Sequence, residues 1–116
     1  MSDELETVDE SIFDFLGSLR RRPGLYFGKT SLVRLQAYLF GYQAGLAKVS
    51  KSLKGEEDFH EFHDWVAKQL GFSSSTVGWC NMILEKSASD EAAFHRFFEL
   101  LEEFKKERSI RNKSTP

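Results

Sequence analysis

The chain has 116 residues and a mass of 13.4 kDa, the size of one ordinary domain. Its 41% hydrophobic and 29% charged residues exclude both a disordered chain and a membrane-embedded one. Its net charge of −2 and pI of about 5.9 argue against a general affinity for nucleic acid or anionic lipid.

The first predicted helix begins near Thr7, because Thr7 and Glu10 have the spacing of a capping box and apolar residues then recur at helical spacing. Pro23 ends this helix, since the residue before a proline is pushed out of the helical region. Pro23 and Gly24 predict a turn in which Gly24 takes a positive φ. We expect the irregular segment from Pro23 to Gly28 to press its apolar side chains onto the next helix.

Ser31 is predicted to cap the second helix, whose periodicity is the clearest in the chain. Its apolar side chains recur at steps of three and four residues: Leu32, Leu35, Leu39, Tyr42, Leu46 and Val49. Ala37, Gly41 and Gly45 lie on another face, and we expect a neighbouring segment to pack closely against them. A polar loop is predicted over residues 50–57.

Three further helices follow in the sequence. The third is predicted over about 58–70 and ends at Gly71. The fourth follows the serine-rich stretch 73–76, and four of its residues are expected to face inward: Val77, Cys80, Ile83 and Leu84. Ser89 is predicted to cap the fifth helix, which carries a wide apolar stripe as far as Phe104.

The sequence therefore predicts an all-α, single-domain bundle of about five helices with an irregular Pro-Gly turn after the first helix. The domain is expected to span 1–116, with an ordered core over about 7–105 and flexible ends at 1–6 and 106–116. A cytoplasmic location is predicted, because Cys80 is the only cysteine and the acidic N-terminus is unlike a signal peptide. No membrane association is expected, since the longest weakly charged run is too short to span a bilayer.

No catalytic or metal-binding constellation is predicted, and neither is a cofactor. His60 and His63 are three residues apart, whereas the helical zinc motif places its histidines four apart. Cys80 is interpreted as a small core residue. The sequence from Pro23 to Thr30 is close to a phosphate-binding loop, but Pro23 stands where that loop needs its first glycine.

Two groups of residues are candidates for a binding site. The first is a basic cluster around the Pro-Gly turn, defined as Arg20, Arg21, Arg22, Lys29 and Arg34. The second is a set of aromatic residues of the kind that anchors interfaces, Tyr26, Trp65 and Trp79. The cluster could bind an acidic protein surface, or a nucleotide, small ligand or nucleic acid through Arg22–Ser31. It could equally be neutralised by nearby acidic residues of the same chain.

Several motifs together resemble a family of small bacterial proteins: Arg22-Pro23-Gly24-x-Tyr26-x-Gly28, Leu39-Phe40-Gly41-Tyr42, Phe59-His60-Glu61-Phe62-His63-Asp64-Trp65-Val66, Trp79-Cys80-Asn81-Met82-Ile83-Leu84, and the Asp90–Phe104 helix. The likeness covers about Leu19 to Phe104. The family is functionally uncharacterised and supplies no catalytic residues. The resemblance implies a stand-alone, helical, cytosolic bacterial protein, and immunity factors for polymorphic toxins share this size and build. The expected function is therefore non-catalytic protein binding, with toxin neutralisation as its specific form.

Overall fold

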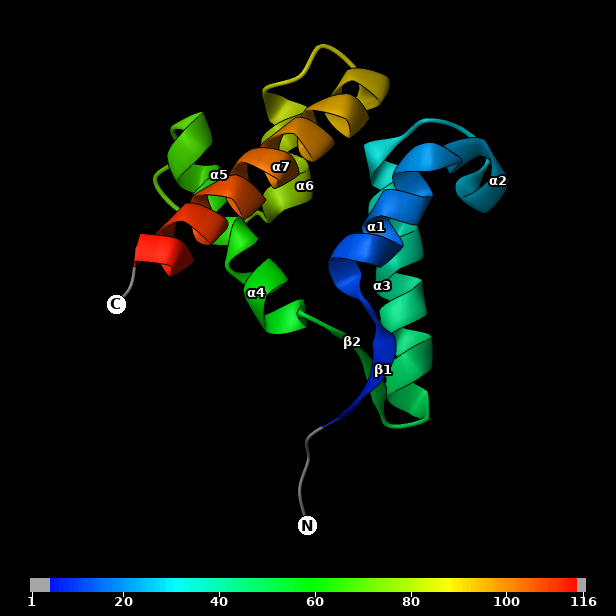
Figure 1. Cartoon of the computed structure of the whole chain (residues 1–116). Coiled ribbons are helices and arrows are strands. Elements are labelled where there is room, and N and C mark those ends of the chain that lie inside the picture. The colour runs from blue at the N-terminus through cyan, green and yellow to red at the C-terminus, as the bar shows by residue number, and fades with distance from the viewer. Residues whose placement is uncertain (1–4, 115–116) are drawn as a thin grey trace. The chain divides into compact units, whose positions relative to one another are not determined.

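The computed structural model describes residues 5–114, and the side chains of residues 5–110. It is predominantly helical, as predicted, and also contains a small two-stranded parallel sheet (Figure 1). The all-α prediction is thus right in its main feature and wrong in excluding strands. The chain divides into two compact units, residues 1–60 and 61–116. That the two units act as the single domain expected from the sequence stays a prediction.

The first unit combines helices with the sheet. Its elements are β1 (Glu6–Ser11), α1 (Ile12–Arg21), α2 (Pro23–Phe27), α3 (Leu32–Lys48), β2 (Lys51–Lys54) and α4 (Glu56–His60). Its buried apolar side chains come from every helix except α2 and from β2: Ile12, Phe15, Leu16, Leu19, Leu32, Leu35, Leu39, Leu53 and Phe59.

The start of the first helix differs from the prediction. Thr7 lies within strand β1, and the capping residue of α1 is Ser11, whose Oγ accepts a hydrogen bond of 3.0 Å from the N–H of Asp14. Ser11 and Asp14 repeat the spacing that Thr7 and Glu10 offer, so two candidate caps compete. Ser11 is used because Thr7 is paired with Ser52 of β2.

The predicted polar loop over 50–57 is also wrong, because it contains β2. The two strands run parallel, with Glu6 beside Lys51 and Ser11 beside Lys54. The side chain of Leu53 in β2 is buried, with 1% of the residue's surface exposed. The loop was expected because its residues are mostly polar. Four of them, Lys51–Lys54, instead form a strand, because they pair with β1 and Leu53 is buried.

The Pro-Gly segment is more regular than expected. Residues Pro23–Phe27 form the short helix α2, with Pro23 at its first position, where a missing N–H costs no hydrogen bond. The positive φ lies at Gly28, with a value of 90°, and not at Gly24. Gly28 ends the helix, and its N–H donates to the carbonyl of Gly24 over 3.1 Å.

Helix α3 begins as predicted, with Ser31 Oγ accepting a hydrogen bond of 3.1 Å from the N–H of Arg34. Only the first half of its apolar stripe is buried, whereas Val49 is 65% exposed. The expected close packing on the small-residue face is wrong. A Cβ atom built on Gly41 or Gly45 would meet no described atom within 4 Å.

The second unit consists of α5 (Phe62–Leu70), α6 (Trp79–Glu85) and α7 (Asp90–Ser114). Six of its buried apolar side chains are aromatic: Phe62, Trp79, Phe94, Phe97, Phe98 and Phe104. The others are Val66, Ala67, Cys80, Met82, Ile83, Ala93, Leu100 and Leu101. Rings of Phe62 and Phe97 meet edge to face, with centroids 5.6 Å apart. Such pairs add to the free energy gained by burying their area.

The third predicted helix is two helices, α4 and α5, with a turn at Glu61 between them. Phe59 packs edge to face on Phe13 of the first unit, whereas Phe62 packs on Trp79 of the second. Apolar residues of the single predicted helix are therefore buried in two different units. The predicted end at Gly71 is confirmed, and Gly71 has the left-handed conformation with a φ of 79°.

Helix α7 is capped by Ser89 as predicted, through a hydrogen bond of 3.0 Å from the N–H of Ala92. It continues to Ser114, so the expected flexible tail is helical over 106–114. Residues 1–4 and 115–116, also expected to be flexible, lie outside the described residues. Val77 was expected to face inward but precedes α6 and is 55% exposed. Within the described part of the chain, no helix has the length and apolarity needed to cross a bilayer.

Candidate functional site

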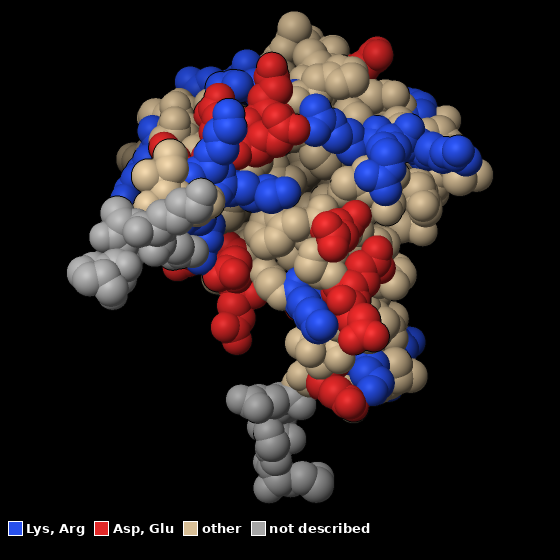
Figure 2. All heavy atoms as spheres, viewed as in Figure 1, with Lys and Arg blue, Asp and Glu red and all other residues tan. Residues whose placement is uncertain are grey.

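The structure brings the basic cluster together at one end of the first unit. Arg20 and Arg21 end α1, Arg22 joins α1 to α2, Lys29 follows α2, and Arg34 lies in the first turn of α3. All five residues are exposed. Lys and Arg atoms gather over this end of α1 and α2 in the space-filling view (Figure 2). The cluster exists because Pro23 and Gly28 force two tight changes of direction within a short stretch of chain.

The scaffold beneath the cluster is held by one guanidinium and by aromatic rings. Arg34 Nη1 donates a hydrogen bond of 3.0 Å to the carbonyl of Phe27, which ties the end of α2 to α3. Tyr38 of α3 contacts the rings of Tyr26 and Phe27, with centroid distances of 5.8 Å and 6.0 Å. Arg34 therefore has a structural task within the first unit.

Two of the acidic residues that could have neutralised the cluster, Glu6 and Asp9, pair with lysines of β2. Lys51 Nζ donates to the carboxylate of Glu6 over 2.6 Å, and Lys54 lies 3.7 Å from Asp9. The hydrogen bond from Lys51, and its charge, lower the pKa of Glu6 below the usual 4.5. Among the described residues, no carboxylate forms an ion pair with Arg22, Lys29 or Arg34. Arg22, Lys29 and Arg34 are thus exposed cations that no carboxylate of the described residues neutralises.

Apolar side chains lie exposed beside these charges. Leu25 is 71% exposed and Tyr26 is 36% exposed, both on α2. The sequence indicated Tyr26 as a binding residue but not Leu25, which was expected to press onto α3. No residue of the five-residue helix α2 is buried, and Leu25 points to solvent. The pattern of residue types alone does not show this.

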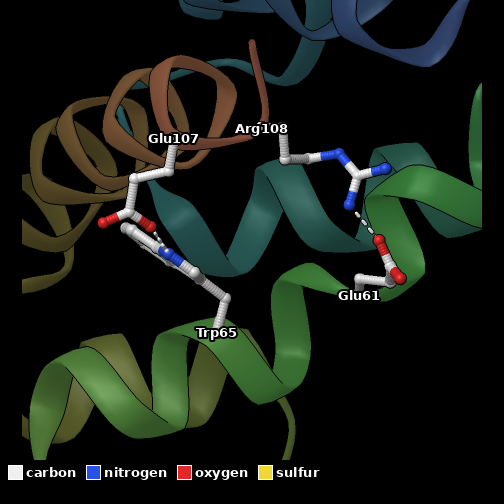
Figure 3. A network of polar contacts seen from close by, with 4 residues as sticks. All are labelled: Glu61, Trp65, Glu107 and Arg108. Carbon is white, nitrogen blue, oxygen red and sulfur yellow. Dashed lines mark hydrogen bonds and ion pairs between the residues drawn. The ribbon is translucent and has the colours of Figure 1, made fainter. Parts of the chain in front are cut away.

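Trp65 lies in the second unit and lines a groove of about 350 Å³, which we call the Trp65 groove. The groove is formed by α5, by Glu61 just before it, and by α7, with these lining residues: Glu61, Asp64, Trp65, Lys68, Phe104, Glu107 and Arg108. Trp65 Nε1 donates a hydrogen bond to the carboxylate of Glu107, and Arg108 forms an ion pair with Glu61 (Figure 3). Five charged side chains, from α5, from α7 and from the turn at Glu61, thus line the groove beside one indole ring.

Aromatic packing orients the ring of Trp65. It stacks on Phe62 with centroids 5.9 Å apart and meets the edge of Phe104 at 5.6 Å. Sequence reasoning found Trp65 but missed Glu107 and Arg108. Both lie about one turn beyond Phe104, the last apolar residue of the α7 stripe, in a segment that was expected to be flexible.

The interpretation of Trp79 as a surface anchor is wrong. Its side chain is 1% exposed and packs on Phe97 with a centroid distance of 4.8 Å. Cys80 is buried as predicted, also with 1% exposure. Burial, with a smaller contribution from the charge of Asp90, raises the pKa of its thiol from 9.0 to about 11. A thiol with this pKa is poorly suited to nucleophilic attack near neutral pH.

His60 and His63 do not share a helix. His60 is the last residue of α4 and His63 is the second residue of α5. Across the described residues, no group of three His, Cys, Asp or Glu side chains is placed to hold a metal ion. The two histidines therefore lie in separate helices, on either side of the turn at Glu61.

The resemblance to a family of small bacterial helical proteins stays a prediction, since it rests on the sequence motifs alone. The residues brought together by the fold are the basic cluster with Tyr26 in the first unit, and the Trp65 groove in the second. Comparison of the chain with protein-family models, with curated proteins and with solved structures gives no match.

Proposed function

We propose that this chain is a non-catalytic, cytoplasmic protein-binding domain that recognises an acidic surface of another protein through its basic cluster. The observation that carries the proposal is the exposure of all five cationic side chains of the cluster, while Glu6 and Asp9 of β1 pair with Lys51 and Lys54. An exposed positive surface attracts and orients a partner of opposite charge.

The composition of the surface supports a protein as the partner. Arginine and tyrosine are enriched among the residues that dominate binding energy at protein interfaces. Here three consecutive arginines lie beside exposed Tyr26 and Leu25. Apolar side chains among the charges give the partner an area to bury as well as charges to pair with.

The toxin-neutralising role is the more specific form of the proposal. It rests on the resemblance of the sequence to small bacterial helical proteins, whose size and build are those of immunity factors. An immunity factor acts by covering its toxin and needs no catalytic residues of its own, which agrees with a function based on a binding surface.

Binding of a nucleotide or nucleic acid through Arg22–Ser31 is the second candidate, because guanidinium groups pair with phosphates as well as with carboxylates. The observation that favours it is the same exposed cluster, with Tyr26 able to stack on a base. Phosphate binding would make the affinity fall steeply with salt concentration.

Affinity capture from an extract of the native host tests the proposal. The variant is Arg20→Gln/Arg22→Gln/Lys29→Gln, which removes three charges and leaves Arg34 to hold α2. The control is Lys48→Gln/Lys105→Gln/Lys106→Gln, which removes three exposed charges outside the cluster. We expect one protein, identified by mass spectrometry, to be retained by the parent chain and the control but lost by the cluster variant.

The same experiment separates the two candidates. Captured material that disappears after nuclease treatment would show nucleic-acid binding. A protein retained equally by the parent and the cluster variant would contradict the role of the basic cluster. Co-expression with the product of the neighbouring gene then tests whether the retained protein is a toxin.

A further inference from the structure

The Trp65 groove plays no part in the function proposed above and has a different chemistry. Its lining combines the rings of Trp65 and Phe104 with three carboxylates, those of Glu61, Asp64 and Glu107. We propose that this groove binds an organic cation, a guanidinium or alkylammonium group, between the indole of Trp65 and the carboxylates beside it.

The indole is held in a fixed orientation. Glu107 accepts the hydrogen bond from its Nε1, and Phe62 stacks on it with an interplanar angle of 17°. Cations are attracted to the face of an aromatic ring, and to tryptophan most strongly. A ring that is already oriented loses little conformational entropy when a cation binds to it.

Two of the three carboxylates have no cationic partner among the described residues. Asp64 accepts a hydrogen bond of 2.5 Å from Ser75 Oγ, and Glu107 accepts one from Trp65, but both donors are neutral. Among the described residues, Glu61 is the only carboxylate of the groove that forms an ion pair. The three carboxylates exceed the two cations of the lining, Lys68 and Arg108, so a cation is favoured over an anion.

The chain itself shows that the groove accommodates such a group. The guanidinium of Arg108 lies 5.4 Å from the centroid of Phe104 and pairs with Glu61. This is one aromatic ring and one carboxylate around one cation. Trp65, Asp64 and Glu107 offer the same combination beside it, and no cation of the described residues is paired with these two carboxylates.

The size of the groove limits the ligand. A volume of about 350 Å³ is at the lower end of the range for small-molecule sites. It suits a single side chain or a small free molecule, so the cation can come from an arginine or lysine of a peptide or from a free organic amine.

Nuclear magnetic resonance of the two indole N–H groups tests the proposal on the full chain. A Trp65→Phe variant assigns the signals. The probes are tetramethylammonium chloride, a blocked Gly-Arg-Gly peptide, the uncharged Gly-Gln-Gly peptide and sodium acetate. We expect the Trp65 signal to shift saturably with the two cations, at about millimolar concentration for so small a ligand, and the Trp79 signal to stay in place.

Matched variants locate the binding. Asp64→Asn removes a lining carboxylate without touching the indole, and we expect it to weaken cation binding by about tenfold. Glu107→Gln should do the same. Glu103→Gln, on the exposed side of α7, is the control and should leave the affinity unchanged.

The peptide and the ammonium ion distinguish the two sources. Tighter binding of the arginine peptide points to a side chain of a partner protein, and tighter binding of tetramethylammonium points to a free amine. The proposal is overturned if neither cation gives a saturable shift, if acetate shifts the signal equally, or if Asp64→Asn binds as the parent does. None of these results depends on the basic cluster, so the function proposed for that surface is tested separately.

Discussion

Gly24 and Gly28 lie four residues apart but have different backbone conformations. The φ of Gly28 is 90°, a value that residues with a side chain rarely adopt. Gly24 lies within α2, where a Cβ atom would have open space around it. Position 28 therefore favours glycine, whereas position 24 can hold a residue with a side chain.

Replacement of these glycines by alanine should have opposite effects. Gly28→Ala should lower the free energy of unfolding by about 1–3 kcal/mol, because of backbone strain. Its Cβ would also lie 2.8 Å from Arg34 Nη1, but that flexible side chain can move. Gly24→Ala, the matched control, should leave stability unchanged or raise it by up to about 1 kcal/mol. Denaturant unfolding of both variants measures the difference, and equal losses would contradict this assignment.

Cys80 should be unreactive in the folded protein. Burial raises the pKa of its thiol from 9.0 to about 11, so little thiolate forms near neutral pH. Labelling by a thiol reagent should then follow unfolding of the second unit. Because the folded state holds the proton more tightly, the thiol's contribution to stability is present below pH 9.0 and is lost as the pH rises towards about 11.

A Cys80→Ala variant isolates this contribution from other groups that titrate in the same range. Its unfolding free energy should fall less steeply than that of the parent between these two pH values. Rapid labelling of the folded parent chain near neutral pH would show that the thiol is accessible and would contradict the predicted behaviour.

At the scale of elements, the boundary between β1 and α1 can be tested by its caps. Ser11→Ala should cost about 1 kcal/mol, since it removes the acceptor for the N–H of Asp14. Thr7→Ala should cost less, because Thr7 is an exposed strand residue and caps no helix. If circular dichroism and urea unfolding instead show the larger loss for Thr7→Ala, the helix begins where the sequence alone suggested.

Several local signals in the sequence were confirmed, although the cap at Thr7 and the positive φ at Gly24 were wrong. Ser31 and Ser89 cap their helices, and Gly71 ends α5, because each acts on backbone groups within a few residues. The strands were missed because β1 and β2 pair residues 45 apart, such as Glu6 and Lys51. No local pattern of residue types reports a partner at that distance.

The same difference between local signals and contacts of distant residues applies to the candidate sites. The basic cluster could be predicted because its residues are close in the sequence and surround one turn. The Trp65 groove could not, because Trp65 and Glu107 are 42 residues apart and meet only through the packing of α5 and α7. Trp79 was wrongly predicted to lie at the surface. It is the first residue of a seven-residue helix, which is too short for periodicity to show which way that residue faces, and the structure places it in the core of the second unit.

At the scale of the whole molecule, the net charge of −2 conceals a local concentration of positive charge. Acidic residues pair with lysines of β2, while the arginines at the end of α1 stay exposed. Overall charge governs solubility and long-range attraction, whereas recognition depends on individual surfaces. A near-neutral pI is therefore compatible with a basic binding surface.

The aromatic residues give each unit its own optical label. All three tyrosines lie within residues 1–60, and both tryptophans within 61–116. Light at the red edge of protein absorption excites indole alone, so tryptophan emission reports the second unit, whereas near-ultraviolet dichroism also contains the tyrosine signal of the first unit. If the chain is one domain, the two unfolding curves should coincide, whereas displaced midpoints would show two units that melt independently. Energy transfer from tyrosine to tryptophan, measured in the same sample, would show whether the two units stay close to each other during unfolding.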